Sequence, residues 1–177
     1  MGEGQHHAEY SNYQGDLSKE ETLQLLVDSY EAVSNDTRNW VANLSNASSL
    51  VWHAYHSLKV PVNWSGFYVI NPTKPEEELI LGPFQGKVAC QIIKFGKGVC
   101  GTAVSSQKTQ LVANVNEFPG HIACDGETQS EIVIPIIKDG KVYGVLDIDC
   151  LALEGFDEVD VEYLEKLVTK ISESNDF

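Results

Sequence analysis

Hydrophobic residues recur at helical spacing near both ends of the chain and at strand-like spacing in the middle. A Ser18-x-x-Glu21 capping box opens the first helical stripe, and a second stripe runs from about Asp36 to Leu58. Near the C-terminus, Asp157 is expected to cap a last helix that carries apolar residues on one face. The pattern therefore predicts two helices before the central region and one after it.

The central region is rich in β-branched and aromatic residues, which favour strands. Predicted strands cover residues 64–70, 79–84, 87–93, 110–113, 131–137 and 141–149, with a short helix over 102–106. The Asp139-Gly140 pair is a strong signal for a tight hairpin turn. Strands in the centre with helices at both ends predict an α+β fold, in which the terminal helices pack on one face of an antiparallel sheet.

Length and charge limit the domain organisation and the partners. The 177 residues suit one domain, with residues 1–16 as a flexible arm and residues 17–177 as the folded part. The 26 acidic and 12 basic side chains give a net charge of −14, which disfavours nucleic acid and anionic membranes as partners. Because no signal peptide or apolar membrane-spanning run is found, we expect a cytoplasmic protein, with the nucleus as a further location.

Four cysteines are the most distinctive chemical feature of the chain. Cys90 is predicted at a strand end, Cys100 in a glycine loop near a helix start, and Cys124 in a long polar loop. The three lack the closely spaced pair that is typical of zinc sites, so no metal is predicted. A lone cysteine is usually a small buried hydrophobe, but a helix start lowers the pKa of a thiol and favours redox chemistry. Cys150 alternates with core positions and is predicted to be buried.

The glycine loop Gly96-x-Gly98-x-x-Gly101 superficially matches a dinucleotide-binding fingerprint. That fingerprint needs a longer helix and an acidic residue about 20 positions further on. Here the predicted helix is too short and no acidic residue stands between Lys108 and Asn116, so we interpret the glycines as allowing a tight bend.

Three carboxylates are expected to lie near one another on two paired strands. Asp147 and Asp149 share a strand face, and Glu131 begins the partner strand. Buried carboxylates are costly unless they are solvated or paired, so a solvated sheet edge is one interpretation. The other is a functional cluster, in which one acid keeps its proton and the group attracts an ammonium ion.

Two aromatic residues share a strand face in the same region. Trp64 and Tyr68 are four positions apart, and Gly66 between them is expected to leave a slot flanked by the two rings. Aromatic core packing explains such a pair, and so does a clamp for a small apolar or sulfur-bearing group.

Together these motifs resemble those of the free methionine-R-sulfoxide reductases, a family of GAF domains, and above all its fungal members. The resemblance extends from about Ser18 to the C-terminus and is strongest in the segments Val88–Gly101, His121–Asp125, Ser130–Pro135 and Gly144–Asp149. It implies a GAF-like fold and the reduction of free methionine-R-sulfoxide, with thioredoxin as the electron donor and no metal or organic cofactor. The implied intermediates are a cysteine sulfenic acid and an intramolecular disulfide.

The resemblance also implies roles for individual residues. The redox cysteines are Cys90, Cys100 and Cys124, the substrate-binding carboxylates are Glu131, Asp147 and Asp149, and the aromatic wall is Trp64 and Tyr68. Cys124 is preferred as the attacking thiol, with Cys100 or Cys90 resolving, and Cys100 is the competing attacker. A GAF module that senses a small ligand or the redox state without turnover is the alternative function. The amphipathic terminal helices allow a homodimer.

Overall fold

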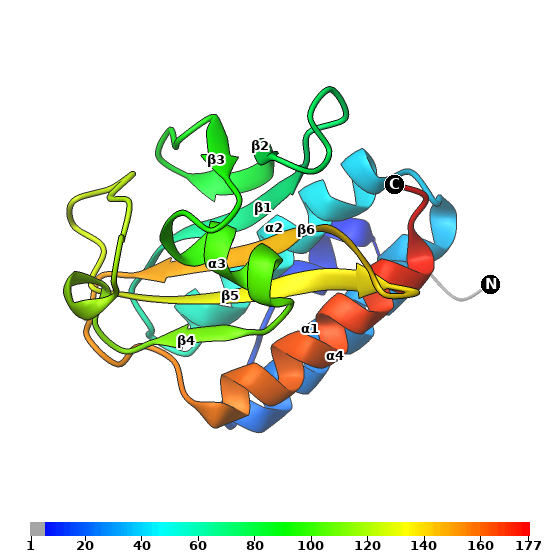
Figure 1. The fold of residues 1–177 in the computed structure, drawn as a ribbon. Coiled ribbons are helices and arrows are strands. Elements are labelled where there is room, and N and C mark those ends of the chain that lie inside the picture. Colours follow the sequence, from blue (N-terminus) through cyan, green and yellow to red (C-terminus); the bar gives the residue numbers. More distant parts are fainter. Residues whose placement is uncertain (1–5) are drawn as a thin grey trace.

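Within residues 6–177, six strands form one sheet in which every pair of neighbours is antiparallel (Figure 1). The computed structural model describes residues 6–177. The strand order is β3-β2-β1-β6-β5-β4. The strands are β1 (Val62–Ile70), β2 (Glu78–Gly86), β3 (Ile92–Lys94), β4 (Gln110–Val112), β5 (Ser130–Lys138) and β6 (Lys141–Cys150). The four long strands, β2, β1, β6 and β5, therefore lie side by side in the centre, and the short strands β3 and β4 lie at the edges.

Helices cover both faces of this sheet, but unequally (Figure 1). One face packs against α2 (Trp40–Ser57) and α4 (Glu158–Ser174), and α1 (Lys19–Val33) lies across these two helices. In the described part of the chain, the opposite face carries the short helix α3 (Gly98–Ser106) and loops. The predicted α+β fold, with the N- and C-terminal helices on one face, is confirmed.

Strand alternation divides the apolar residues into two cores, one on each face. Phe67, Ile134 and Leu146 belong to the core under the long helices, and so does the fully buried Cys150, as predicted. Trp64 and Val145 belong to the core under α3. The second core is the smaller of the two and is only partly covered, which leaves room for a site.

Side-chain caps fix where the long helices begin. The Ser18 hydroxyl accepts from the backbone N–H of Glu21, which confirms the predicted capping box. Asp157 caps α4, also as predicted. The second helix begins at Trp40 rather than near Asp36, because Asn39 provides the cap and residues 34–36 form a separate 3-10 turn.

The third predicted strand is the largest departure from the sequence-based expectation. Only Ile92–Lys94 pairs with β2, and residues 87–91 form a loop, so Cys90 lies in a loop and not at a strand end. Hydrogen bonds from side chains, and not a strand ladder, fix the position of this loop. The Trp64 indole N–H donates to the carbonyl of Lys87 at 3.2 Å. The Tyr68 hydroxyl likewise donates to the carbonyl of Cys90 at 2.8 Å.

The glycine loop makes a tight bend, as expected, and the helix after it starts earlier than predicted. Gly96 and Gly98 adopt φ values of +74° and +62°, which other residues rarely adopt. A Cβ on Gly101 would lie 2.4 Å from the carbonyl oxygen of Lys94. The bend lets α3 begin at Gly98 instead of residue 102 and places Cys100 in its first turn.

The predicted arm of residues 1–16 falls partly outside the described residues, which begin at residue 6. Within it, His7–Ser11 forms a 3-10 helix, and the Tyr13 hydroxyl donates to the carbonyl of Leu50 in α2 at 3.1 Å. Among residues 6–177, no helix combines the length and apolar character that crossing a membrane requires.

Candidate active site

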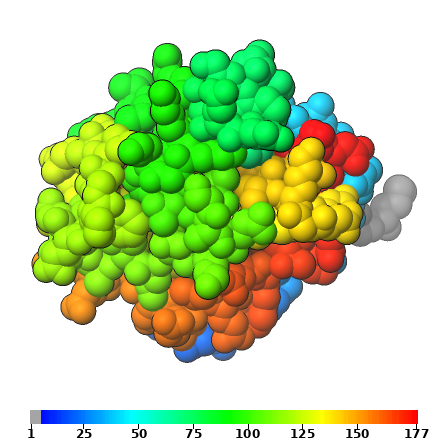
Figure 2. Space-filling view, in the orientation of Figure 1, coloured from blue at the N-terminus to red at the C-terminus, as the bar shows by residue number. Residues whose placement is uncertain are grey.

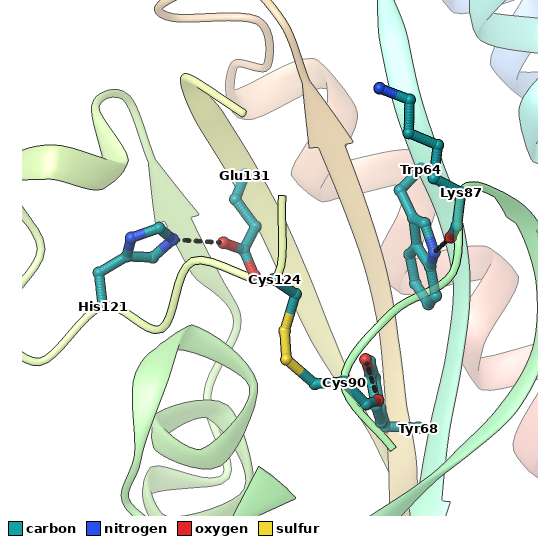
Figure 3. The surroundings of a disulfide bond; sticks show 7 residues. All are labelled: Trp64, Tyr68, Lys87, Cys90, His121, Cys124 and Glu131. Carbon is teal, nitrogen blue, oxygen red and sulfur yellow. Dashed lines mark hydrogen bonds and ion pairs between the residues drawn. A yellow bond between two sulfur atoms is a disulfide. The ribbon is translucent and has the colours of Figure 1, made fainter. Parts of the chain in front are cut away.

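A small cavity of about 50 Å³ lies on the sheet face that carries α3. Seven of the eight residues predicted from the sequence line it, namely Trp64, Tyr68, Cys100, Cys124, Glu131, Asp147 and Asp149. The eighth, Cys90, is bonded to Cys124 at its edge (Figure 3). The fold thus brings together all eight side chains that the sequence analysis proposed for the site, while their roles remain predictions.

A disulfide joins Cys90 and Cys124, which are 34 positions apart in the sequence. Cys90 comes from the loop before β3 and Cys124 from the loop between β4 and β5. These loops contain residues 87–91 and 118–129, and the green and yellow-green segments that hold them lie side by side at the molecular surface (Figure 2). A Lys87–Glu127 ion pair of 2.8 Å bridges the same loops. The two loops together form the outer wall of the cavity.

Cys100 is not part of this disulfide and is 4% exposed. Its sulfur and a carboxylate oxygen from each of Glu131 and Asp147 lie within 4.8 Å of one another. Burial raises the pKa of the Cys100 thiol well above its ordinary value, and the negative charges of Asp147 and Glu131 raise it further. The expectation that the helix start lowers this pKa is wrong, because desolvation and two carboxylates outweigh the helix N-terminus.

The three carboxylates lie in the centre of the sheet. Glu131 and Asp149 are directly opposite on β5 and β6, and Asp147 is opposite Val133. Glu131 and Asp147 are buried and Asp149 is half-buried, so the solvated-edge interpretation is wrong. Oδ1 of Asp147 is buried with no hydrogen-bond partner among residues 6–177.

Burial also governs the protonation of these acids. It raises the pKa of Asp147 to about 6, although the adjacent Glu131 and Cys100 side chains lower it. Burial raises the pKa of Glu131 and of Asp149 well above their ordinary values, and repulsion from Asp147 adds to this in both. The cluster therefore retains protons near neutral pH and can donate one to a bound group.

The aromatic pair forms a wall of the cavity, but the slot expected at Gly66 is absent. The rings of Trp64 and Tyr68 stack with centroids 5.7 Å apart, and Phe84 stacks on Trp64 at 5.2 Å. A Cβ on Gly66 would lie 2.3 Å from the Cβ of Phe84. Gly66 therefore admits Phe84 from β2, and the expected gap is filled.

The structure adds contacts that the sequence patterns did not indicate. Nε2 of His121 lies 3.9 Å from Oε2 of Glu131, and burial lowers the pKa of this imidazole (Figure 3). The Asn63 amide donates to Thr128 at 3.0 Å and to Asp125 at 3.3 Å, which ties the Cys124 loop to β1. The only signal for His121 was its place in the segment that contains Cys124, since loop residues have no periodicity.

Comparison with known proteins places this site within a family. The GAF domain family model matches residues 17–173. The free methionine-R-sulfoxide reductase of Saccharomyces cerevisiae is 64% identical over 172 residues, covering 97% of this chain and 95% of the yeast protein. The chain belongs to the free methionine-R-sulfoxide reductase family.

Solved structures agree with this family membership. A GAF-domain structure that is 61% identical to this reductase-family chain matches all of both chains with a TM-score of 0.96. The free methionine-R-sulfoxide reductase from Neisseria meningitidis, solved in complex with its substrate, is 37% identical with a TM-score of 0.84. That match covers 92% of this chain and 93% of the Neisseria chain. The GAF-like fold expected from the resemblance is confirmed.

Proposed function

We propose that this protein reduces free methionine-R-sulfoxide to methionine with cysteine thiols, and that thioredoxin restores the thiols. The observation that carries the proposal is the Cys90–Cys124 disulfide beside a cavity lined by three buried carboxylates. Family membership supports it, since relatives that match nearly the whole chain are free methionine-R-sulfoxide reductases. No metal or organic cofactor enters the reaction as we propose it.

In the first step, the Cys124 thiolate attacks the sulfoxide sulfur while a protonated carboxyl group donates a proton to the oxygen. The attack forms a transient bond between the sulfur of Cys124 and the substrate sulfur. The protonated oxygen then moves from the substrate sulfur to the sulfur of Cys124 as the transient sulfur–sulfur bond breaks, so methionine leaves with a restored lone pair on sulfur and Cys124 becomes a sulfenic acid. The Cys90 thiol then attacks this sulfenic acid, forms the disulfide and releases water. A dithiol such as reduced thioredoxin returns both cysteines to thiols by exchange.

We assign the attack to Cys124 rather than Cys100 for two reasons. Cys124 is exposed and already bonded to a resolving partner, Cys90. Cys100 is buried beside two acids that raise its pKa, so little of it is the nucleophilic thiolate. Of the two candidates for the resolving cysteine, Cys90 and Cys100, we therefore propose Cys90.

The carboxylates account for selection of the free amino acid. Glu131, Asp147 and Asp149 offer negative charge for the substrate ammonium, which a methionine within a peptide chain lacks. Trp64 and Tyr68 provide an apolar wall for the methyl group. In the disulfide form the cavity of about 50 Å³ has room for only a few water molecules. Substrate therefore binds after the disulfide opens.

The proposal extends to partners and location. The docking partner is thioredoxin, and a homodimer through the terminal helices and a cytoplasmic location are part of the same proposal. A GAF sensor module is the second candidate, and the redox-active pair at the surface is what favours a redox version of it. Such a sensor forms the disulfide without producing methionine.

Turnover separates these functions. The protein is mixed with thioredoxin, thioredoxin reductase, NADPH and free methionine-R-sulfoxide, and both NADPH consumption and methionine are measured. We expect turnover with the R-epimer and little with N-acetylmethionine-R-sulfoxide, whose ammonium is blocked. Absence of methionine under these conditions would contradict the proposal and favour the sensor.

Single-turnover experiments with prereduced protein test the cysteine roles. We expect Cys124→Ser to form no methionine and Cys90→Ser to form one equivalent before stalling. Cys100→Ser is expected to form its equivalent of methionine, and failure to do so would transfer the attack to Cys100. Cys150→Ser, a change in the opposite core, is the matched control for losing a buried thiol.

A further inference from the structure

The Cys100 thiol and two buried acids form a compact donor cluster beneath the disulfide. We propose that Cys100, Glu131 and Asp147 bind a thiophilic divalent cation, and that Zn²⁺ matches the donor set best. The proposed cation is a ligand that occludes the site and takes no part in the reduction. Its binding does not depend on which cysteine attacks the substrate.

The geometry is close to that of a zinc site. The sulfur and the two carboxylate oxygens come from α3, β5 and β6 and lie within 4.8 Å of one another. Around tetrahedral Zn²⁺, with bonds of about 2.0–2.3 Å, neighbouring ligand atoms are about 3.5 Å apart. Side-chain rotations that move each donor by about 1 Å would close the site.

An unpartnered atom points independently to a missing ligand. Asp147 is only 6% exposed, lines the cavity, and its Oδ1 has no hydrogen-bond partner among residues 6–177. By contrast, the buried carboxylate of Glu78 accepts from the Asn71 amide at 2.8 Å and lies 3.6 Å from the ammonium of Lys74. A buried carboxylate oxygen without a partner is costly, and a cation in the cavity would remove that cost.

The charges around the cluster favour a cation and the sulfur selects its type. Within the described part of the chain, no lysine or arginine forms an ion pair with Glu131 or Asp147. His121 is the one basic residue paired with Glu131 there, while Lys87 and Lys97 line the same cavity without an ion pair to either acid. A thiolate with two carboxylates would carry three negative charges, which a divalent cation largely neutralises. Thiolate ligation favours Zn²⁺ over Mg²⁺ and Ca²⁺, which prefer oxygen ligands alone.

A fourth ligand is available at the same place. Nε2 of His121 lies 3.9 Å from Oε2 of Glu131, and neutral imidazole is a common zinc ligand. The cavity of about 50 Å³ also has room for a water molecule as the fourth ligand. One consequence rests on the proposed function: bound Zn²⁺ displaces the substrate ammonium and inhibits turnover.

Binding is tested on the full-length protein in its disulfide form, where Cys90 and Cys124 cannot ligate a metal. Equilibrium dialysis measures Zn²⁺ stoichiometry, and Co²⁺ serves as the optical probe, because a thiolate–cobalt bond gives a charge-transfer band in the near ultraviolet. We expect one thiolate-ligated Co²⁺ per chain, displaced by Zn²⁺ and unaffected by a large excess of Mg²⁺. The adjacent His6 and His7 give no such band, since they provide only nitrogen ligands.

Variants locate the site. Cys100→Ser and Cys100→Ala are expected to abolish the band, and Cys150→Ser, the other free cysteine, to leave it intact. Asp147→Asn and Glu131→Gln should each weaken Zn²⁺ affinity by tenfold or more. A band that persists without Cys100, or no Zn²⁺ bound at micromolar concentrations, would overturn the inference.

The activity of the metal-loaded protein is measured separately from binding. With the site occupied, Zn²⁺ is expected to raise the apparent KM for methionine-R-sulfoxide. If binding is found in a protein that shows no turnover, the proposed function fails and the metal site stands. If turnover is found without metal binding, the reverse holds.

Discussion

Two buried aspartates on opposite faces of the sheet have very different surroundings. Asp160, on the face covered by the long helices, is 0% exposed and contacts the Lys19 ammonium, the Tyr55 hydroxyl and the backbone N–H of Asp157. Asp147, on the α3 face, is 6% exposed and has an unpartnered oxygen within the described chain. One carboxylate has an ion pair and two hydrogen bonds, and the other is next to two more acidic groups.

The difference separates a structural role from a functional one. Asp160 joins α1, α2 and α4 through Lys19 and Tyr55, so its cost of burial is partly offset within the fold, although burial still raises its pKa. Among residues 6–177, Oδ1 of Asp147 has no such partner, so this cluster either retains protons or binds a cationic group. A buried acid without partners marks the face where the molecule binds something.

Replacing Asp147 by Asn should produce the largest functional effect. The amide keeps the size of the side chain but removes the acid and its charge, so we expect activity to fall by about 10²–10⁴-fold. Stability at pH 7.5 should stay the same or rise, because a buried charge beside Glu131 and Asp149 is lost. Steady-state kinetics and urea unfolding measure the two effects, and a destabilised but active variant would contradict the assignment.

Replacing Asp160, on the face covered by the long helices, is expected to reduce stability and to leave activity unchanged. Asp160→Ala removes the reciprocal cap of α4 and leaves the buried Tyr55 hydroxyl without a partner. We expect a loss of about 2–4 kcal/mol in the free energy of unfolding, combining a cap with an unsatisfied buried group. Activity of the folded fraction at low temperature should be unchanged. A stability equal to that of the parent would show that this network contributes nothing.

The sequence predicted most of this architecture, because helix caps and strand alternation are local signals. Ser18 and Asp157 cap the helices as expected, and alternation correctly assigned Cys150 to the core. The 87–93 strand was wrong because apolar composition does not reveal that side chains of Trp64 and Tyr68 replace the ladder there.

Site properties that depend on tertiary neighbours were harder to predict. The pKa of Cys100 follows burial and carboxylates from two distant strands, neither of which a helix-start argument includes. The prediction of a slot at Gly66 was wrong for the same reason, since Phe84 from another strand fills that space. The donor cluster also lacks a zinc-like spacing, because its ligands are separated by 31 and 16 positions and meet only in the fold.

The smallest predicted effect is a pH dependence of stability that differs between the two faces. Burial raises the pKa of Asp147 from 3.8 to about 6, so the folded state favours its protonated form. The stability that Asp147 contributes by binding a proton in the folded state is fully present below about pH 4 and is lost as pH rises through 6. On the other face, the hydrogen bond from Lys19 lowers the pKa of Asp157. The stability that Asp157 contributes therefore has the opposite pH dependence and is lost as pH falls.

The direction of the Asp147 effect follows from its raised pKa, which makes the folded state lose stability as pH rises. The net charge of −14 also destabilises the protein as pH rises, so measurements on the parent alone cannot separate this repulsion from the effect of Asp147. Urea unfolding is therefore measured for both the parent and Asp147→Asn between pH 4 and 7.5, since the general repulsion affects both proteins alike. We expect the parent to lose more stability over this range than the variant does. Parallel curves would mean that Asp147 titrates normally, and the contrast between the two aspartates would then rest on contacts alone.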